Sequence, residues 1–315
     1  MVEDLAHRGA QLILLSRCHT DIWTVQHIED LRDRTGNHLI YSETCDLSSL
    51  HSIRLFATKW IDNSPPRRLD MIVCCAGVFQ PPFKARQTSK DNVEIHWATN
   101  YLAYYHLLTL LSPVIRVQPP DRDVRIIFAT CAFYALGPLD LDDVEFKARG
   151  YPMSKPWNVY GASKLALMVF AKMFQETVTE YKRPDGYPSN VHCILVDPGL
   201  TRSPMTRRVL SMGSLWGLLL YLMMWPMWWI VLKSCREGAE TILFAAMSQE
   251  VAKEKELKLY RDCAEAMIRR PEVFSKSFGE KLWKLSADNI KQLEKASAVQ
   301  RKINELKSKE KIIEL

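Results

Sequence analysis

A tyrosine and a lysine stand four residues apart in the segment NVYGASKLA, which spans residues 158–166. The segment has a helical pattern, and residues four apart lie on one face of a helix, so Tyr160 and Lys164 are predicted to be neighbours. A free tyrosine hydroxyl has a pKa of about 10. A nearby ammonium group favours the phenolate and lowers that pKa, so the pair predicts an acid or base for a carbonyl or alcohol oxygen.

The composition is that of a globular protein with one large domain. Of the 315 residues, 47% are hydrophobic and 25% charged, which excludes a disordered chain and a protein with many membrane spans. The net charge of +6 is spread along the chain without a zinc-finger or RNA-binding motif, so nucleic acid is not an expected partner. The eight cysteines form no C-x-x-C pair, which predicts no metal site and buried free thiols in a reducing compartment.

Short apolar runs alternate with helical patterns along most of the chain. This alternation predicts βαβ units, so the expected fold class is α/β with a doubly wound, Rossmann-like parallel sheet. The expected strands span residues 11–16, 38–43, 70–75, 124–130 and 191–196, and the expected helices span 48–61, 88–112, 158–181 and 237–252. Most of these strands are apolar on both faces, which is typical of strands covered by helices on each side.

Two segments depart from this pattern. Residues 215–232 read LWGLLLYLMMWPMWWIVL, eighteen residues without a charge. From about residue 285 the chain is rich in lysine and glutamate, which predicts a solvated helix, with a short coiled coil or partner-binding segment as the alternative. We therefore expect an α/β domain at 1–275, with an apolar membrane segment at 212–232, and a charged helical tail at 276–315.

Six ordered motifs resemble those of the short-chain dehydrogenase/reductase family. They are AHRGAQLILLSR, CDLSSLHSIRLFA, IVCCAG, TNYLAYYHLLT, YGASK and VDPGLTRS, within about residues 2–265. Inside the family the chain is most similar to retinol-dehydrogenase-like members, and especially to a fungal membrane-associated group of oxidoreductases that share PPDRDVR before the fifth strand. Six motifs in order make this likeness far more specific than the tyrosine–lysine spacing alone.

The resemblance implies roles for five residues at a catalytic site. Tyr160 would be the proton donor and acceptor, Lys164 would tune it and hold the nicotinamide ribose, and Asn100 would anchor the water relay behind the lysine. The family's catalytic serine aligns best with Cys131, whose thiol is a weak donor. Thr130 has a hydroxyl but is expected on the other side of the strand. Three outcomes stay open: the loop presents Thr130, the site works without this hydrogen bond, or it no longer does chemistry.

The resemblance also implies a nicotinamide dinucleotide as cofactor. The matched positions are Asp46 and Leu47 at the adenine, Ala76 and Gly77 in a turn that reads CCAG in place of NNAG, and Pro198 and Gly199 beside the nicotinamide. Each of these positions also has a structural explanation, such as a helix cap for Asp46 or a plain turn for the glycines. Their shared family order favours the cofactor site.

Arg17 indicates which dinucleotide would bind. It follows the strand expected at 11–16, where NAD-preferring family members carry an acidic residue that holds the ribose 2′-hydroxyl. A guanidinium at this position would instead accept a 2′-phosphate, so the expected cofactor is NADP. A simple surface charge is the alternative.

The family's first strand and its TGxxxGIG loop have no counterpart, because Met1 matches the middle of the family's first helix. That loop places backbone N–H groups against the cofactor pyrophosphate. The strand would lie between those at 11–16 and 70–75, so its loss leaves backbone groups unpaired at about 1–3 kcal/mol each. We expect a natural start upstream of Met1; a shortened protein that repairs the gap in another way is the alternative.

The uncharged segment predicts contact with a membrane. Eighteen residues reach the lower limit for a spanning helix, but one crossing would separate the following REGAETILFAAMS and KLYRDC segments from their sheet. We therefore expect a monotopic or re-entrant insertion, with Trp216, Trp225, Trp228 and Trp229 near the interface. A buried helix or an oligomer contact is the alternative, and the latter leaves a homo-oligomer open.

The apolar segment occupies the place of the family's substrate lid, so the expected substrate is a lipophilic carbonyl or alcohol such as a sterol or retinoid. The predicted function is an NADP-dependent oxidoreductase at the endoplasmic reticulum or lipid droplets, with its catalytic domain facing the cytosol. A non-catalytic scaffold or regulatory protein at a membrane is the alternative. Cys131 and the missing loop favour this alternative, whereas Asn100, Tyr160 and Lys164 together favour the enzyme.

Overall fold

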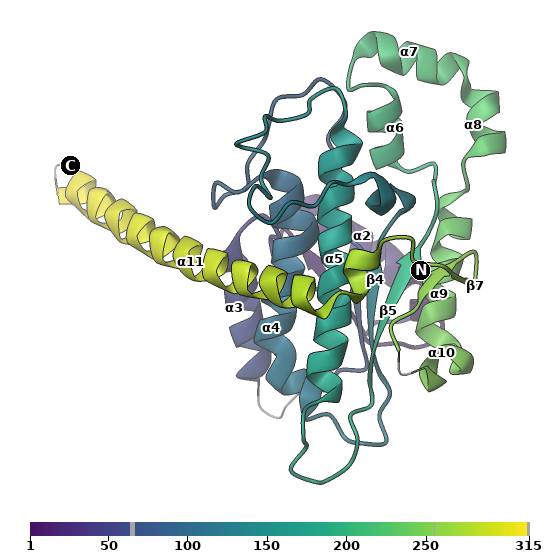
Figure 1. Cartoon of the computed structure of the whole chain (residues 1–315), viewed down its shortest axis with the longest axis vertical. Helices are drawn as coiled ribbons and strands as arrows, with labels where there is room; N and C mark the ends of the chain where they lie inside the picture. The colour runs from purple at the N-terminus through teal and green to yellow at the C-terminus, as the bar shows by residue number, and fades with distance from the viewer. Residues whose placement is uncertain (64–66, 255, 314–315) are drawn as a thin grey trace.

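The computed structural model describes residues 1–63, 67–254 and 256–313. Parallel strands form the centre of the molecule, helices cover them on both sides, and the last helix projects away from the body (Figure 1). Helix α5 packs on strands β4 and β5 from one side, and helix α9 packs on the same two strands from the other. The predicted α/β fold with a parallel sheet is therefore confirmed.

All five predicted strands form within about two residues of their expected bounds. The strands are β1 (Leu12–Ser16), β2 (Ile40–Thr44), β3 (Met71–Cys74), β4 (Val124–Ala129), β5 (Val191–Asp197), β6 (Leu259–Arg261) and β7 (Ala264–Ala266). Strand β7 was not predicted, and it pairs antiparallel with β6 through a two-residue turn. Both turn residues, Asp262 and Cys263, have positive φ angles, as this hairpin turn requires.

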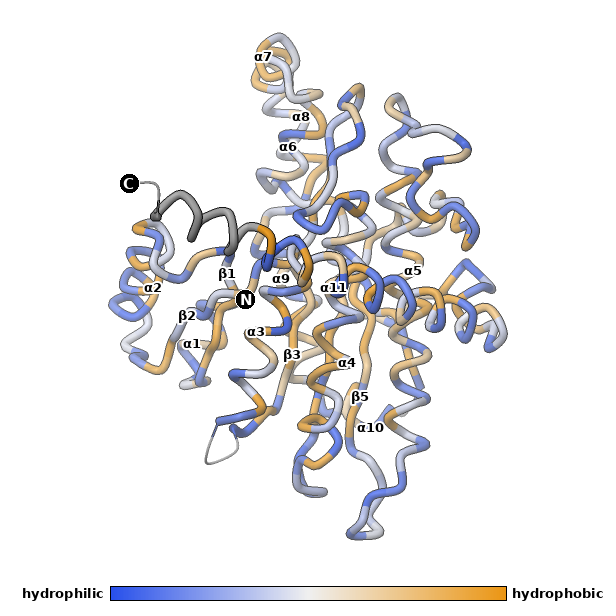
Figure 2. Tube along the Cα trace, turned by 90° about the vertical axis from the view of Figure 1, so that its left-hand side faces the viewer, coloured by the Kyte–Doolittle hydropathy of each residue, from blue (hydrophilic) through white to orange (hydrophobic). Residues whose placement is uncertain are grey.

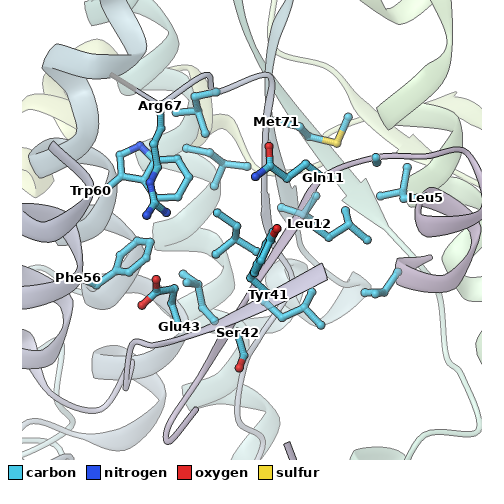
Figure 3. Close-up of a pocket in the computed structure, with 18 of the residues that line it drawn as sticks. Leu5, Gln11, Leu12, Tyr41, Ser42, Glu43, Phe56, Trp60, Arg67 and Met71 are labelled. Atoms are coloured by element: carbon cyan, nitrogen blue, oxygen red, sulfur yellow. The ribbon is translucent and has the colours of Figure 1, made fainter. Parts of the chain in front are cut away.

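The strands of the described residues form two sheets rather than one. Strands β1 and β2 pair in parallel, and a second sheet has the order β3-β4-β5-β6-β7. Between β1 and β3 lies a cavity of about 1210 Å³, lined by both strands and by side chains such as Tyr41 and Trp60 (Figure 3). The expected gap at this place in the sheet is therefore present.

Each of the four predicted helices has a counterpart, and the helix at 22–35 was not predicted. The helices are α1 (Val2–His7), α2 (Ile22–Thr35), α3 (Leu50–Ile61), the π-helical turn η1 (Trp97–Leu102), α4 (Ala103–Arg116), the 3₁₀ turn η2 (Ala132–Leu136), α5 (Pro156–Thr179), α6 (Pro204–Leu210), α7 (Leu215–Met223), α8 (Trp225–Val231), α9 (Cys235–Met247), α10 (Gln249–Lys253), the 3₁₀ turn η3 (Pro271–Phe274) and α11 (Lys276–Ile313).

Two predicted helices have wrong bounds. The helix expected at 88–112 begins near residue 95, because the chain before it forms a turn with Asn92 at a φ of 61° and a bridge between Thr88 and Glu94. The helix expected at 237–252 is interrupted at Ser248, whose extended backbone ends α9 and whose side chain caps α10.

The apolar segment folds into two short helices instead of one long helix. Helix α7 ends at Met223, and α8 begins at Trp225 with a proline in its first turn. Both helices project from the body and are largely hydrophobic (Figures 1 and 2). In the part of the chain that the structure describes, no helix is both long and apolar enough to cross a membrane.

The predicted C-terminal helix is present as α11, but its first half is not solvated as expected. Leu282, Ser286 and Ile290 are buried against the domain, and the Tyr101 hydroxyl lies 2.6 Å from the Ser286 hydroxyl. Residues 314–315 of the predicted tail lie outside the described residues.

The cysteine prediction is only partly correct. All eight cysteines are free thiols, as expected. Cys45, Cys74 and Cys193 are buried and Cys131 is half-buried, whereas the other four are exposed. A position inside an apolar run therefore did not guarantee burial, as Cys75 at the end of β3 shows.

Candidate active site

The predicted site residues follow the carboxyl ends of parallel strands. Arg17 follows β1, Asp46 and Leu47 follow β2, Ala76 and Gly77 follow β3, Thr130 and Cys131 follow β4, and Pro198 and Gly199 follow β5. In an open α/β sheet, ligands bind in the crevice outside these strand ends. The topology therefore brings residues that lie far apart in the sequence to one edge of the two sheets.

Helix α5 presents the tyrosine and the lysine. Its close contact with η2 depends on two glycines, because a Cβ on Gly161 would lie 2.2 Å from the Phe133 carbonyl oxygen. A Cβ on Gly137 would lie 2.1 Å from the backbone of Gly161 and Ala162. Without these side chains, the Tyr160 end of α5 packs directly against the loop that follows β4.

Lys164 is almost fully buried. Its Nζ donates a 2.7 Å hydrogen bond to the Ala129 carbonyl oxygen and lies 5.8 Å from the centre of the Tyr160 ring. Burial lowers the pKa of Lys164, because a charged amine loses hydration in this environment. The lysine is therefore next to the tyrosine, as predicted.

The Tyr160 hydroxyl does not have the predicted lowered pKa. Burial raises the pKa of Tyr160 well above its ordinary value, and the nearby Cys131 thiol and Asp197 carboxylate act in the same direction. The expected lowering by Lys164 is wrong for this arrangement, because loss of hydration dominates. Tyr160 therefore keeps its proton at neutral pH.

The structure distinguishes the two candidates for the serine position. The Cys131 thiol is close enough to the Tyr160 hydroxyl to contribute to its raised pKa, and burial raises the pKa of Cys131 to about 11, so it remains a thiol at neutral pH. The Thr130 hydroxyl is buried and has no hydrogen-bond partner among the described residues. Cys131, and not Thr130, is therefore the neighbour of Tyr160.

Asn100 fixes the loop that follows β3. Its Oδ1 accepts a 2.7 Å hydrogen bond from the Val78 N–H, and its Nδ2 donates to the Val78 carbonyl and to the Ser163 hydroxyl. A Cβ on Gly77 would lie 3.0 Å from Asn100 Oδ1 and 3.6 Å from Lys164 Nζ. Asn100 thus joins this loop to α5 and keeps it close to the lysine.

The residues at the edge of the N-terminal sheet differ in exposure, because Asp46 is buried and Arg17 is not. Arg17 is exposed at the end of β1. Asp46 accepts hydrogen bonds from the N–H and hydroxyl of Ser48 and lies 2.8 Å from Lys90 Nζ. The helix cap that could explain Asp46 is instead Ser49, so Asp46 orders the turn before α3.

The turn after β5 also has a defined geometry. Gly199 has a φ of 74°, and its N–H donates to Asp197 Oδ1 at 2.9 Å. The other oxygen of Asp197 pairs with Arg261 from β6 at 2.5 Å. Because this φ favours glycine, the turn needs a glycine at position 199 whether or not a ligand binds there.

No established family profile matches the chain. An uncharacterized oxidoreductase of Schizosaccharomyces pombe is 48% identical over 295 residues, which cover 94% of this chain and 78% of the relative. An uncharacterized oxidoreductase of Saccharomyces cerevisiae is 38% identical over 318 residues, which cover 95% and 77%. Human retinol dehydrogenase 13 is 28% identical over 284 residues, which cover 90% and 78%. The chain belongs to the short-chain dehydrogenase/reductase family.

This short-chain dehydrogenase/reductase is an oxidoreductase, as predicted. Its fold is also that of a solved short-chain dehydrogenase from Sphingobium yanoikuyae in complex with NADPH. The two structures have a TM-score of 0.54 and 17% sequence identity, over 82% of this chain and 80% of the other. At this identity the comparison shows the fold alone.

The residues of this short-chain dehydrogenase/reductase fit part of a nicotinamide dinucleotide. Gly77 lies close to the Lys164 amine, and the exposed guanidinium of Arg17 is of a type that pairs with phosphate groups. The sequence contains no glycine-rich loop for a pyrophosphate. Lys164 and Arg17 are therefore the two side chains that could hold a ribose and a phosphate of such a cofactor.

Three aromatic residues around Tyr160 were missed by the sequence analysis. Phe79, His96 and Phe133 all pack against its ring. They come from the loop after β3, the residue before η1 and the turn η2, and no spacing in the sequence connects them. Their proximity to the YGASK helix follows only from the tertiary fold.

Proposed function

We propose that this chain is an NADP-dependent oxidoreductase that acts on a lipophilic carbonyl or alcohol, with Tyr160 as its acid and base. One observation carries the proposal: the Tyr160 hydroxyl, the Cys131 thiol, the Lys164 amine and the Asn100 amide lie together beside the strand ends of the main sheet. This is the constellation expected for proton transfer to an oxygen next to a bound nicotinamide.

NADPH, when bound, would supply a hydride to a carbonyl carbon. Tyr160 would donate its proton to the carbonyl oxygen, and its raised pKa ensures that the hydroxyl is protonated at neutral pH. Lys164 would hold the nicotinamide ribose, and the Cys131 thiol would orient the Tyr160 hydroxyl. A protonated tyrosine is the form that can donate a proton to a carbonyl oxygen.

The preference for NADP is attributed to Arg17. This guanidinium is exposed after β1 and can pair with a 2′-phosphate. Replacing it with aspartate would remove that partner and add a carboxylate suited to a 2′-hydroxyl. We expect Arg17→Asp to weaken NADPH binding at least tenfold relative to NADH binding, as measured by fluorescence titration.

A lipophilic substrate is supported by the exposed apolar surface of α7 and α8. Leu215, Trp216 and Ile230 are each more than four-fifths exposed, and Arg207 and Arg208 lie in the preceding helix α6. Apolar side chains beside arginines suit the boundary between acyl chains and anionic headgroups. Retinol dehydrogenase 13 is named for a lipophilic alcohol, which agrees with this substrate class.

We place this surface on a membrane as a monotopic contact, at the endoplasmic reticulum or lipid droplets, with the catalytic domain in the cytosol. The contact would involve Trp216, Trp225 and Trp229, three of the four predicted tryptophans. Trp228 instead stacks on the buried Tyr221 at 5.7 Å and donates a hydrogen bond to its carbonyl, so it joins α8 to α7.

The catalytic proposal is tested with the full chain in detergent, by following NADPH oxidation with a panel of retinoid, sterol and isoprenoid carbonyls. Tyr160→Phe should lower kcat about 10²–10⁴-fold, because it removes the proton donor. Tyr187→Phe, at a residue that is 59% exposed, is the control and should be neutral. If Tyr160→Phe retains full activity, Tyr160 is not the acid. If neither NADPH nor NADH binds, the non-catalytic scaffold is the better account.

The membrane contact is tested by flotation with vesicles of phosphatidylcholine and phosphatidylserine. Trp216→Ser combined with Ile230→Ser should abolish flotation, because both apolar side chains leave the interface. Trp23→Ser is a matched control, since Trp23 is 78% exposed but lies in α2. Equal loss of flotation with the control would exclude a specific role for α7 and α8.

A further inference from the structure

The Tyr160 ring is enclosed by aromatic side chains. Phe79 stacks on one face, with ring centres 4.3 Å apart and planes inclined by only 7°. Phe133 and His96 contact the ring edge-on, at 6.3 and 6.2 Å. Rotation about the Cα–Cβ bond of Tyr160 moves its hydroxyl most, because the hydroxyl is at the far end of the side chain. A phenyl ring stacked on one face therefore restricts the hydroxyl.

Phe79 is in turn held by His96. The His96 Nε2 lies 3.1 Å from the backbone nitrogen of Gln80, the residue after Phe79. A backbone N–H can only donate, so Nε2 accepts and carries no proton. The ring proton is then on Nδ1, which donates to Glu94 Oε1 at 2.7 Å. The imidazole thus connects the loop of Phe79 to a carboxylate.

Glu94 is fully buried, yet its carboxylate is well supplied with donors. Besides His96, Oε2 accepts a 2.8 Å hydrogen bond from the Trp97 N–H, and Oε1 lies 3.2 Å from the Tyr151 hydroxyl. Burial tends to raise the pKa of Glu94, but the hydrogen bond from His96 and the other donors hold it below its ordinary value. A buried ionised carboxylate with this set of donors fixes the orientation of the His96 ring.

We propose that His96 is a positioning residue for the Tyr160 hydroxyl, that it acts through the Phe79 ring stacked on the tyrosine, and that Glu94 orients the His96 ring in the wild-type chain. The pair itself does not contact the reacting atoms. Its effect on turnover rests on the proposed function, whereas its effect on the Tyr160 ring can be measured without any substrate.

The matched variants separate the two hydrogen bonds of His96. His96→Gln can place an amide oxygen near the Nε2 position, so it can still accept from the Gln80 N–H. His96→Asn places its amide near the Nδ1 position and leaves that N–H without an acceptor. A residue that only fills core space would respond to lost volume alone, which is larger for asparagine by one methylene group, and the melting temperatures of the two variants measure that loss. Phe83→Leu is the control on the same loop, because Phe83 is 68% exposed.

The first experiment measures the flip rate of the Tyr160 ring by NMR on the full chain with ¹³C-labelled tyrosine, assigned by comparison with Tyr160→Phe. A flip turns the ring about the axis through its hydroxyl, so the rate reports how tightly Phe79 packs on the ring, and the effect on the position of the hydroxyl is left to the turnover experiment. We expect the flip rate to rise at least tenfold in Phe79→Leu and in His96→Asn. It should stay within threefold of wild type in His96→Gln and Phe83→Leu. Equal rates in all folded variants would overturn the proposal, and unchanged melting temperatures would show that the variants are folded.

The second experiment measures turnover with NADPH. The same two variants, Phe79→Leu and His96→Asn, should lower kcat about tenfold and change the KM for NADPH less than twofold. Rescue of kcat in His96→Gln would support positioning through the Gln80 N–H. Faster ring flips in a chain without any turnover would support the arrangement around Tyr160 and refute the proposed function, so the two failures are distinguishable.

Discussion

The N-terminal unit of α1, β1, α2 and β2 is built differently from the five-stranded sheet. In β4 and β5 every residue is buried, whereas in β1 none is fully buried. The buried apolar residues of the N-terminal unit are only Ala6, Ile28, Leu31 and Ile40 in its cluster, while the main core includes side chains from α3, α4, α5 and the sheet. The cavity between β1 and β3 accounts for this difference, because it leaves one edge of each unit unpaired.

This contrast separates the two halves of the proposed cofactor site. Tyr160, Lys164 and Asn100 are set in the densely packed region. Arg17 and Asp46 are carried by the thinly packed unit, where Asp46 is tied to the main body by its ion pair with Lys90. Recognition of the phosphate is thus expected to be more sensitive to the stability of the N-terminal unit than the acid–base chemistry is.

The largest difference is expected from large-to-small substitutions in the two regions. Ile126→Ala in β4 removes a fully buried side chain and should lower the free energy of unfolding by about 2–5 kcal/mol. Leu14→Ala in β1 removes a half-buried side chain that already faces the cavity, so about 1 kcal/mol is expected. Urea unfolding measures the free energy of unfolding of both variants. Equal losses would contradict the difference in packing between the two regions.

Hydrogen exchange should show the same contrast without mutation. The Leu12 amide bonds the Leu39 carbonyl at 2.8 Å, and the Arg125 amide bonds the Asp70 carbonyl at 3.0 Å, so the two bonds are similar. The Leu12 amide should nevertheless exchange at least about 100-fold faster, because the N-terminal unit opens locally with less loss of buried surface. Exchange is measured by mass spectrometry or NMR. Equal exchange rates of the Leu12 and Arg125 amides would mean that the two sheets open together.

The stability of the well-packed region should depend on pH where α11 packs against α4. His106 in α4 is buried 3.3 Å from Glu294 of α11, and burial lowers its pKa to about 4. The unfolded chain therefore binds this proton first, so the contribution is complete above about pH 6.5 and is lost as the pH falls towards 4. The loss should be about 3 kcal/mol in urea unfolding.

His106→Leu should remove this part of the pH dependence between pH 6.5 and 4. His38→Leu, at an exposed histidine of the N-terminal unit, is the control and should leave the slope unchanged. An unchanged slope in His106→Leu would mean that protonation of His106 does not oppose folding.

The smallest effect is expected from the surface ion pair between Arg34 and Glu3, which joins α2 to α1. The two side chains are 3.2 Å apart and about half exposed. Solvent screens such a pair, so Arg34→Ala should change the free energy of unfolding by less than about 0.5 kcal/mol. A loss above about 1 kcal/mol would show that the N-terminal unit depends on surface charge to compensate for its small core.

Much of the fold could be predicted because strand periodicity and family order agree. The five parallel strands were expected from local sequence, whereas the gap beside β1 and the site residues at the strand ends were expected from the family resemblance. The turn before η1 was not, because it depends on Asn92 in a left-handed conformation, for which the dipeptide Asp91-Asn92 was the only signal. The break in the apolar segment was signalled by Pro226, which suits the first turn of a new helix.

The candidate site was only half visible in the sequence. Tyr160 and Lys164 are neighbours through one turn of a helix, which spacing predicts. Phe79, His96 and Phe133 reach Tyr160 through tertiary packing, which spacing does not encode. Whether the pKa of Tyr160 is raised or lowered also depends on burial, which is a property of the whole fold.

The π-helical turn η1 makes residues 97–102 sensitive to the deletion of a residue. Asn100 lies within it, and Tyr104, one turn later, donates its hydroxyl to the Ala76 carbonyl. A π-helical turn holds one more residue than an α-helical turn, and each helical residue turns the chain by about 100°. Deletion of one residue from 97–102 would rotate one side of the helix against the other. Either Asn100 or the buried face of α4 would then lose its partners. A substitution in this segment should therefore be tolerated better than a deletion.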